Sequence, residues 1–502
     1  MSSAARDRHS RARADAPLAA EVVHLSAEYL PFARTGGLAE AVTGLASYQA
    51  AAGVTTTALV PLFRSVRDAG ATLVPFGEPF TLAVGPREEP ARLWRLEAPA
   101  GPRVLFLEHE AYFDREGLYG VGGADYPDNG RRFGYLCRAA LEALPRIARA
   151  PVVLHLHDWH TALAAVYLRT EYRGRQPYDS TGVVLTVHNA GFQGHFPFEA
   201  LADLGLSDEL YDWQRLEWHG RVNWLKGGLV YTDMATTVSP THAHELRTAA
   251  GGFGLHETFI SLGDRLVGIL NGIDQHAWDP TRDPHLTAAF SAEALDGKAR
   301  CKRALQRGAG FPLRARAPLF ALSARLAAQK GIDLVLDGQV LDTPDAQFVL
   351  LGEGEARYAA ALAGRAAAAP ERIAYESRFT DRFEHRLLAG ADVLLMPSLY
   401  EPCGLTQMRA QRYGALPVAR RVGGLADTID DEDTGFLFDE YTPAALELAV
   451  RRALALYARP ADWEAHVRRA MGRECGWQHR GPQYIELYRR ALARRRAAIA
   501  EA

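Results

Sequence analysis

One carboxylate in this chain of 502 residues stands in a setting typical of a catalytic site. An apolar run over Val393–Met396 predicts a strand, the polar loop after it contains Glu401, and a helical pattern begins near Gln407. In an α/β sheet such a junction opens the crevice outside the carboxyl end of the strand, where unpaired helix N–H groups point. A glycine pair at 423–424 would let backbone amides approach a charged group. The segment predicts a pocket for a sugar phosphate.

A second candidate phosphate site lies near the N-terminus. A strand predicted over 22–26 leads through a loop to Gly36 and Gly37, and a helix is predicted from Leu38. Glycine permits close approach to a diphosphate, the helix end favours negative charge, and Arg34 adds a cation. A lone glycine pair would be better explained by an ordinary tight turn.

Two polar residues end buried strands in the first half of the chain. The run over 152–160 predicts a strand that ends in polar residues including Asp158, and a strand over 182–186 leads to His188. Polar groups at the carboxyl end of a strand belong in a ligand crevice. A neutral imidazole there could hydrogen-bond a sugar hydroxyl, although a single histidine elsewhere is more often structural. Trp159 is at least as consistent with packing as with binding.

Lysine is scarce in this arginine-rich chain. Among 57 lysines and arginines only four are lysine, at Lys226, Lys298, Lys302 and Lys330. Lys330 and Arg325 both follow a strand predicted over 319–323, in the loop before the next helix. Such residues are usually solvated surface charges, but a strand end and a retained lysine favour a functional pair.

The composition bounds the class of protein. At 48% hydrophobic content the chain is long enough for two domains or more, and its formal charge of −3 gives no reason to expect nucleic acid or an acidic membrane as partner. Four scattered cysteines lack metal or disulfide spacing, which indicates a reduced cytosol. No apolar run approaches the ~20 residues that span a bilayer. We expect a soluble, cytoplasmic protein.

These motifs together resemble the bacterial glycogen synthases and plant starch synthases, over about residues 21–492. The family's motifs have counterparts here in the same order: Lys-x-Gly-Gly-Leu at 34–38, His-Asp-Trp-His at 157–160, Thr-Val-His-Asn at 186–189, Asn-Gly-Ile-Asp at 271–274 and Ser-Arg-Leu-x-x-Gln-Lys-Gly at 324–331, where Ala324 stands at the serine position and Ser323 just before it. Several separated motifs that agree are far more specific than any one of them.

The resemblance implies an α/β architecture of the GT-B class, with two Rossmann-like domains facing across a deep cleft. We expect a disordered tail over 1–20, an acceptor-side domain over 21–275 and a nucleotide-sugar domain over 285–480. The stretch between them, up to about Pro284, is interpreted as a hinge. A helix over 481–502 should cross back to the first domain.

The implied reaction is retaining transfer of glucose from ADP-glucose to the non-reducing 4-hydroxyl of an α-1,4-glucan such as glycogen. The resemblance places Glu401, Arg325, Lys330, His188 and Asp158 in catalysis. It places the following residues in substrate binding: Arg34, Gly36, Gly37, Asn271, Phe379, Cys403, Gly404, Leu405 and Thr406. We expect no metal and no cofactor, since no Asp-x-Asp motif stands at a strand end, and the sequence does not indicate an oligomeric state.

Two departures from the family pattern leave alternatives open. Arg34 replaces the motif's lysine and Glu40 replaces an aspartate, so UDP-glucose or another nucleotide-glucose is the alternative donor. A phosphorylase would need a lysine for pyridoxal phosphate, and the only lysine in a second-domain motif is Lys330. A catalytically inactive glucan-binding protein is the third alternative, against which the intact catalytic residues argue.

Overall fold

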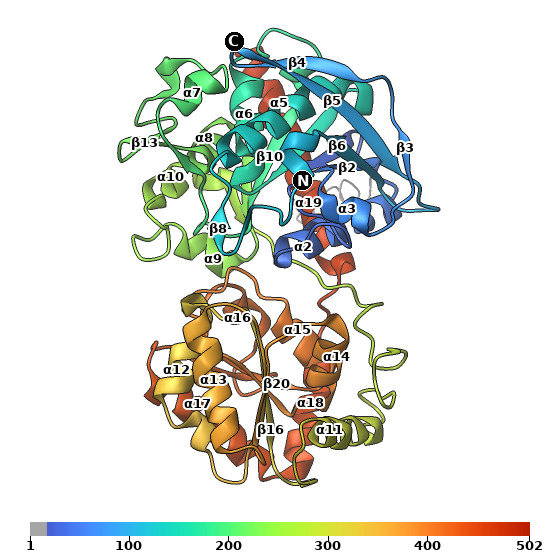
Figure 1. Cartoon of the computed structure of the whole chain (residues 1–502), viewed down its shortest axis with the longest axis vertical. Coiled ribbons are helices and arrows are strands. Elements are labelled where there is room, and N and C mark those ends of the chain that lie inside the picture. Colours follow the sequence, from blue (N-terminus) through green and yellow to red (C-terminus); the bar gives the residue numbers. More distant parts are fainter. Residues whose placement is uncertain (1–17, 502) are drawn as a thin grey trace, which may run out of the picture. The chain divides into compact units, whose positions relative to one another are not determined.

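The computed structural model describes residues 18–501, so most of the expected tail over 1–20 lies outside the described residues. The chain divides into two α/β units (Figure 1). The first contains the residues up to Val238, Ala243–Gly272 and the C-terminal segment from Trp477, and the second contains Ser239–His242 and Ile273–Gly476. None of the helices within 18–501 is long and apolar enough to cross a membrane.

The first unit is built on a 10-stranded sheet with the order β15-β14-β10-β9-β1-β2-β6-β5-β3, in which β4 pairs with β5. The strands from β15 to β6 in this order are parallel, whereas β3, β4 and β5 form an antiparallel edge. The strand bounds are β1 Glu21–Leu25, β2 Thr56–Pro61, β3 Leu73–Pro75, β4 Phe80–Val84, β5 Arg87–Leu96, β6 Arg103–Glu108, β9 Val152–His157, β10 Gly182–Val187, β14 Met234–Thr237 and β15 Leu266–Gly268.

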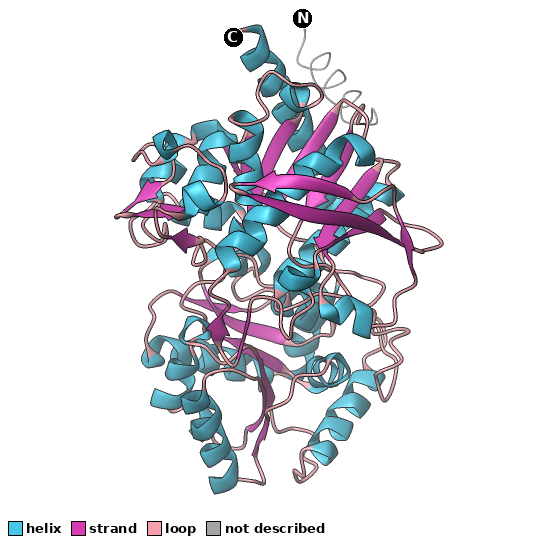
Figure 2. Ribbon diagram, turned by 45° about the horizontal axis from the view of Figure 1, so that its top comes forward, coloured by secondary structure: helices cyan, strands magenta, loops and turns pink. Residues whose placement is uncertain are grey.

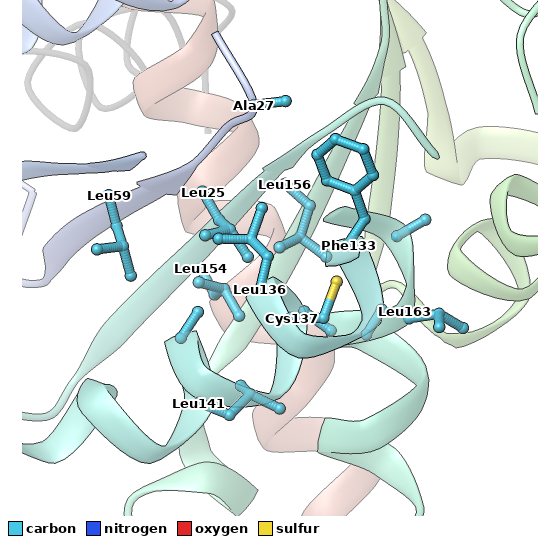
Figure 3. Close-up of a cluster of buried hydrophobic side chains, with 14 of the residues drawn as sticks. Leu25, Ala27, Leu59, Phe133, Leu136, Cys137, Leu141, Leu154, Leu156 and Leu163 are labelled. Atoms are coloured by element: carbon cyan, nitrogen blue, oxygen red, sulfur yellow. The ribbon is translucent and has the colours of Figure 1, made fainter. Parts of the chain in front are cut away.

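Helices cover both faces of this sheet. One face packs against α5 (Asn129–Ile147), α6 (Trp159–Arg169) and α8 (Trp224–Tyr231), and the other against α2 (Gly37–Ala51) and α19 (Trp477–Ala500). Side chains alternate between the faces because successive strand residues point in opposite directions. Figure 3 shows Leu25, Leu154 and Leu156 of the sheet beside Phe133 and Leu136 of α5, in the core of the first face.

Smaller elements complete the first unit. They are α3 Arg64–Asp68, α4 Glu110–Phe113, β7 Gly120–Val121, β8 Ala124–Asp125, β11 His195–Phe196, α7 Ala200–Asp203, β12 Glu217–Trp218, β13 Arg221–Asn223, α9 Pro240–Glu245, partly assigned to the second unit, and α10 His256–Ser261. Three of the strands, β11, β13 and β12, form a separate small sheet.

The C-terminal helix returns to the first unit, as expected. It begins at Trp477 rather than at 481, and Pro482 lies within it. Its start is fixed by close packing on α2, since a Cβ at Gly44 would lie 2.0 Å from Trp477 Nε1. Its Tyr488 hydroxyl bonds His155 of β9 and Gln49 of α2, as described below.

The second unit is a six-stranded parallel sheet with the order β18-β17-β16-β19-β20-β21. Its strands, drawn in magenta in Figure 2, are β16 Leu319–Ser323, β17 Gln347–Leu351, β18 Ile373–Glu376, β19 Val393–Met396, β20 Leu416–Arg420 and β21 Phe436–Phe438. Its helices are α11 Asp296–Gly308, α12 Ile332–Asp337, α13 Ala356–Ala368, α14 Asp381–Gly390, α15 Thr406–Arg412, α16 Gly423–Thr428, α17 Pro443–Tyr457 and α18 Pro460–Met471.

The stretch interpreted as a hinge, up to Pro284, packs on the second unit instead of standing free. The Trp278 ring stacks on His385 with 3.8 Å between centroids. Asp283 accepts hydrogen bonds from His385 Nδ1 at 2.6 Å and from the Tyr413 hydroxyl at 2.5 Å. The chain passes between the units at Gly272–Ile273 and again at Gly476–Trp477. These aromatic and polar contacts join segments that are distant in the sequence.

Three of the four lysines are buried and bond backbone carbonyls. Lys298 donates to the carbonyls of Ala389, Ala391 and Tyr413 at 2.7–3.2 Å, and burial lowers its pKa to about 8. Lys302 bonds Asp392 at 2.6 Å. A compact ammonium can direct three protons at converging oxygens, which a planar guanidinium cannot do. Lysine is therefore retained at these positions for its shape.

We predict that Lys298→Arg lowers the free energy of unfolding by about 1–3 kcal/mol, because the larger group overpacks a filled site. Urea unfolding followed by circular dichroism measures the change. The matched control is Arg300→Lys, an exposed charge-conserving exchange on the same helix, which should leave stability unchanged. Equal stability of Lys298→Arg and wild type would contradict the shape argument.

Candidate functional site

The second unit's candidate site lies where its strand order reverses. The chain runs from β16 outward to β17 and β18, then returns to β19 on the other side of β16. The loops that follow β16 and β19 therefore lie side by side at the carboxyl edge, which is the usual ligand position in such sheets. Gly331, at φ 68°, lies so close to the other loop that a Cβ would be 1.9 Å from the Pro397 carbonyl oxygen. Only glycine permits this approach.

Lys330 and Glu401 meet across these two loops. Lys330 Nζ lies 2.6 Å from Glu401 Oε2, and the Ser398 hydroxyl donates to the same oxygen at 3.0 Å. The Glu401 residue is 6% exposed, whereas the Lys330 side chain is 21% exposed. The other carboxylate oxygen, Oε1, has no hydrogen-bond partner within residues 18–501 and is not buried. The pair thus presents one anchored oxygen and one accessible oxygen.

The remaining sequence-predicted residues of the second unit lie at the same sheet edge. Arg325 follows β16, is exposed and makes no hydrogen bond or ion pair with any described residue. Gly404 and Leu405, whose amides have no acceptor in the described part of the chain, precede α15, and they are flanked by the buried Cys403 and the half-buried Thr406. Phe379 follows β18, and its amide donates to Glu353 Oε1 at 2.7 Å. Cations and unpaired amides at one edge can bind an anion.

The first unit repeats this arrangement at its own reversal of strand order, between β1 and β9. The loop after β1 carries Arg34, which is paired with Glu40 at 3.1 Å. The departures from the family pattern at positions 34 and 40 therefore contact each other. Gly36 caps α2 in an extended conformation, and a Cβ there would meet no atom within 4 Å. Neither backbone strain nor packing within the chain requires glycine at this position.

Glu28, which sequence reasoning passed over, holds this loop in place. Its carboxylate accepts from the Thr35 amide at 2.9 Å, from the Thr35 hydroxyl at 2.6 Å and from the Tyr119 hydroxyl at 2.8 Å. The residue is only 3% exposed. An acidic residue directly after the first strand was the available signal, but its partner Tyr119 is distant in the sequence.

Asp158 joins the ends of two strands. Its backbone has φ 57° and ψ −176°, a conformation that costs a residue with a side chain about 1–3 kcal/mol and that clusters at functional sites. Its Oδ1 accepts from the amides of His188 at 2.6 Å and Asn189 at 3.4 Å. Burial raises the pKa of this carboxyl to about 7. Asp158 and His188, predicted from separate strands, are thus in contact.

His188 belongs to a layer of histidines that sequence reasoning missed. His24, His155 and His157 lie on the α2 and α19 face of the sheet and are at most 1% exposed. Burial lowers the pKa of His188 to about 3, so its imidazole is neutral, as the sequence analysis assumed. The signal was present as the alternation Leu154-His155-Leu156-His157, which places both imidazoles on one face of a buried strand.

Asn271 follows the carboxyl end of β15, next to the point where the chain leaves the first unit. It is 4% exposed, and its Oδ1 has no partner within the described residues. The predicted residues thus form two sets. One set, at an edge of the first sheet, contains Arg34, Gly36, Gly37, Asp158, His188 and Asn271, and the other, at an edge of the second sheet, contains Arg325, Lys330, Phe379, Glu401 and 403–406.

We predict that Asp158 makes stability fall as pH rises from about 4 to 7. Across that range the folded state keeps a proton that the unfolded carboxyl, with a pKa near 3.9, has lost, so up to about 1.4 kcal/mol is lost per pH unit. Above pH 7 this contribution is constant. Asp158→Asn has no titrating group at this position. Urea unfolding at pH 5 and pH 8 should therefore show that the free energy of unfolding of the variant, relative to that of wild type, is higher at pH 8 than at pH 5. A pH-independent difference would contradict the raised pKa.

Comparison with known proteins identifies the family. Residues 21–261 match the starch synthase catalytic domain model and residues 310–470 match the glycosyl transferases group 1 model. Glycogen synthases from Syntrophotalea carbinolica and Anaeromyxobacter dehalogenans are each 43% identical to this chain, over 93% of it and over 98% and 99% of those proteins.

The solved catalytic domain of starch synthase IV from Arabidopsis thaliana, bound to ADP and acarbose, aligns with a TM-score of 0.87. It is 32% identical, and the alignment covers 94% of this chain and 99% of that one. The GT-B fold class predicted from the sequence is confirmed by this match. The chain belongs to the glycogen synthase and starch synthase family of glycosyltransferases.

Proposed function

We propose that this protein extends α-1,4-glucan by retaining transfer of glucose from ADP-glucose to the non-reducing 4-hydroxyl. The observation that carries the proposal is the contact between Lys330 and Glu401 at 2.6 Å, on adjoining loops at the carboxyl edge of the second sheet. A fixed cation beside a carboxylate with one accessible oxygen suits a donor that has a diphosphate on one side and a sugar on the other. The ADP bound to the Arabidopsis relative supports adenosine as the nucleoside.

In the proposed mechanism the second unit stabilises the leaving group. As the bond from glucose C1 to the diphosphate oxygen breaks, negative charge grows on the diphosphate. Lys330, Arg325 and the amides of Gly404 and Leu405 meet that charge, and their interaction strengthens toward the transition state, which lowers the barrier. Lys330 is shared between the phosphate and Glu401.

Glu401 acts on the sugar. Its accessible Oε1 can accept a hydrogen bond from a glucose hydroxyl or face the positive charge of an oxocarbenium-like transition state. The departing diphosphate oxygen takes the proton of the acceptor hydroxyl on the same face, so the configuration at C1 is retained. The first unit contributes the strand-end residues Asp158 and His188, which bind and orient hydroxyl groups.

The primary experiment is a panel of nucleotide-glucose donors assayed with glycogen as primer. We expect the largest kcat/KM with ADP-glucose and formation of α-1,4 linkages. A clear preference for UDP-glucose would overturn the donor assignment and leave the reaction class intact. Glycogen binding without nucleotide release from any donor would establish an inactive glucan-binding protein instead.

We predict that Lys330→Ala and Glu401→Gln each lower kcat by about 100-fold or more, because each removes a fixed charge from the reacting centre. The matched control is Arg365→Ala, which removes a surface partner of Asp342 in the same unit at 2.7 Å. Steady-state assays of nucleotide release, with circular dichroism to verify folding, measure the effect. Folded Lys330→Ala with wild-type turnover would refute the role of the pair.

We predict that Arg34 and Glu40 act as a coupled unit in donor binding. Arg34→Lys and Glu40→Asp should each raise the donor KM, and the double variant should recover part of the loss. Because the pair is partly exposed, a coupling of about 0.5–1 kcal/mol is expected. Additive effects on the KM for both ADP-glucose and UDP-glucose would show that the two exchanges are independent.

A further inference from the structure

A continuous series of hydrogen bonds runs through the buried histidine layer to His188. His24 Nδ1 lies 3.0 Å from His157 Nε2, and His157 Nδ1 lies 3.0 Å from His188 Nε2. At the far end His24 Nε2 lies 2.8 Å from Oε1 of Gln49 on α2. Gln49 Nε2 in turn donates to the hydroxyl of Tyr488 on α19 at 2.7 Å. Four segments of the first unit are thereby connected.

The imidazoles in this series are neutral at physiological pH. Burial lowers the pKa of His24 to about 4 and that of His188 to about 3, and burial holds the pKa of His157 well below its usual value. A neutral imidazole carries one N–H and one lone pair. Each ring must therefore donate at one nitrogen and accept at the other, so the whole series has a single direction.

Gln49 sets that direction. Its amide nitrogen is used by Tyr488, so its Oε1 accepts the proton of His24 Nε2. His24 Nδ1 must then accept from His157 Nε2, and His157 Nδ1 must accept from His188 Nε2. The consequence is that His188 carries its proton on Nε2 and a lone pair on Nδ1.

A second branch is compatible with this orientation of Gln49. The Tyr488 hydroxyl accepts from Gln49 and donates its own proton to His155 Nδ1 at 2.8 Å. His155 Nε2 then donates to the Thr186 hydroxyl at 2.6 Å. Each of these three hydrogen bonds has one donor and one acceptor, so the second branch can form together with the first.

The free end of the series is His188 Nδ1. Within residues 18–501 it has no hydrogen-bond partner, and it is not among the buried atoms. We propose that Gln49 and Tyr488 are positioning residues that act through His24 and His157 to hold His188 in the Nε2–H tautomer, so that Nδ1 accepts a hydrogen bond from a sugar hydroxyl. The identity of that ligand rests on the proposed function, whereas the tautomer does not.

The same three buried histidines have the spacing of a metal site. Candidate ligand atoms of His24, His155 and His157 all lie within 4.8 Å of one another. However, both ring nitrogens of each histidine already have a partner within the chain. The hydrogen-bond network is complete as it stands, and this favours the series over a metal centre.

The direct test is the tautomer of His188 in the full-length protein labelled with ¹⁵N-histidine. Long-range ¹H–¹⁵N correlation distinguishes a protonated from an unprotonated ring nitrogen, and His188→Gln assigns the signal by its loss. We expect Nε2 protonated and Nδ1 unprotonated at pH 7. Protonation at Nδ1 in the wild-type protein would overturn the proposal, and this measurement needs no variant of the series to fold.

Variants at the far end test whether the tautomer is set there. Gln49→Leu and Tyr488→Phe remove the group that orients His24, so the His188 signals should shift toward a mixture of the two tautomers. Loss of one oriented hydrogen bond to substrate should lower kcat about fivefold. The matched control is Tyr167→Phe, which also loses one buried hydroxyl bond, to the Leu204 carbonyl at 2.8 Å, and should change neither the tautomer nor kcat.

The outcomes separate this proposal from the proposed function. If both variants fold and His188 keeps a pure Nε2–H signal, the positioning role is wrong even when glucan synthesis is found. If the tautomer responds as expected but no donor supports synthesis, the proposed function alone fails. Stoichiometric metal in the purified protein, lost in His24→Gln, would replace the series with a metal centre.

Discussion

The second unit depends on the close approach of the loops that follow β16 and β19. Gly331 lies against the Pro397 carbonyl, and this contact brings a lysine from one loop within 2.6 Å of a carboxylate from the other. Removing two charges from water costs several kcal/mol per ion, and it is tolerated here because each charge faces the other. Any side chain at position 331 would separate the loops. The ion pair between Lys330 and Glu401 therefore depends on glycine at this position.

In the first unit, too, the ends of two strands are held close together, here by the carboxyl group of Asp158 instead of a glycine. Asp158 adopts a backbone conformation that side chains disfavour, and its carboxyl oxygen caps the amide of His188. Two effects act on the charge of this carboxyl in opposite directions. Burial disfavours the charged carboxylate, whereas the amide donors stabilise it. The rigid strand ends of β9 and β10 hold the residue there, and the strain is concentrated at the edge where a ligand binds in sheets of this kind.

The sequence predicted those parts of the structure that are encoded locally. The apolar runs of β16 and β19 have the observed bounds, and strand-end residues such as Glu401 and His188 were identifiable because parallel sheets gather their ligands at one edge. Bonds between distant segments were not predictable. Gln49 and Tyr488 contact each other across 439 positions of sequence, and the Glu28–Tyr119 bond likewise depends on tertiary packing. The pairing of Arg34 with Glu40 required the helix geometry of α2.

The scarcity of lysine has a chemical consequence. Lys226, Lys298 and Lys302 are each at most 8% exposed and their amines are bonded to carbonyls, whereas the Lys330 side chain is 21% exposed. Among the four lysine side chains, an acylating reagent therefore meets one accessible amine, and that amine lies beside Glu401. The rate of acylation at Lys330 would therefore report whether the site is occupied. Because the chain has so few lysines, this residue can be labelled selectively with a covalent probe.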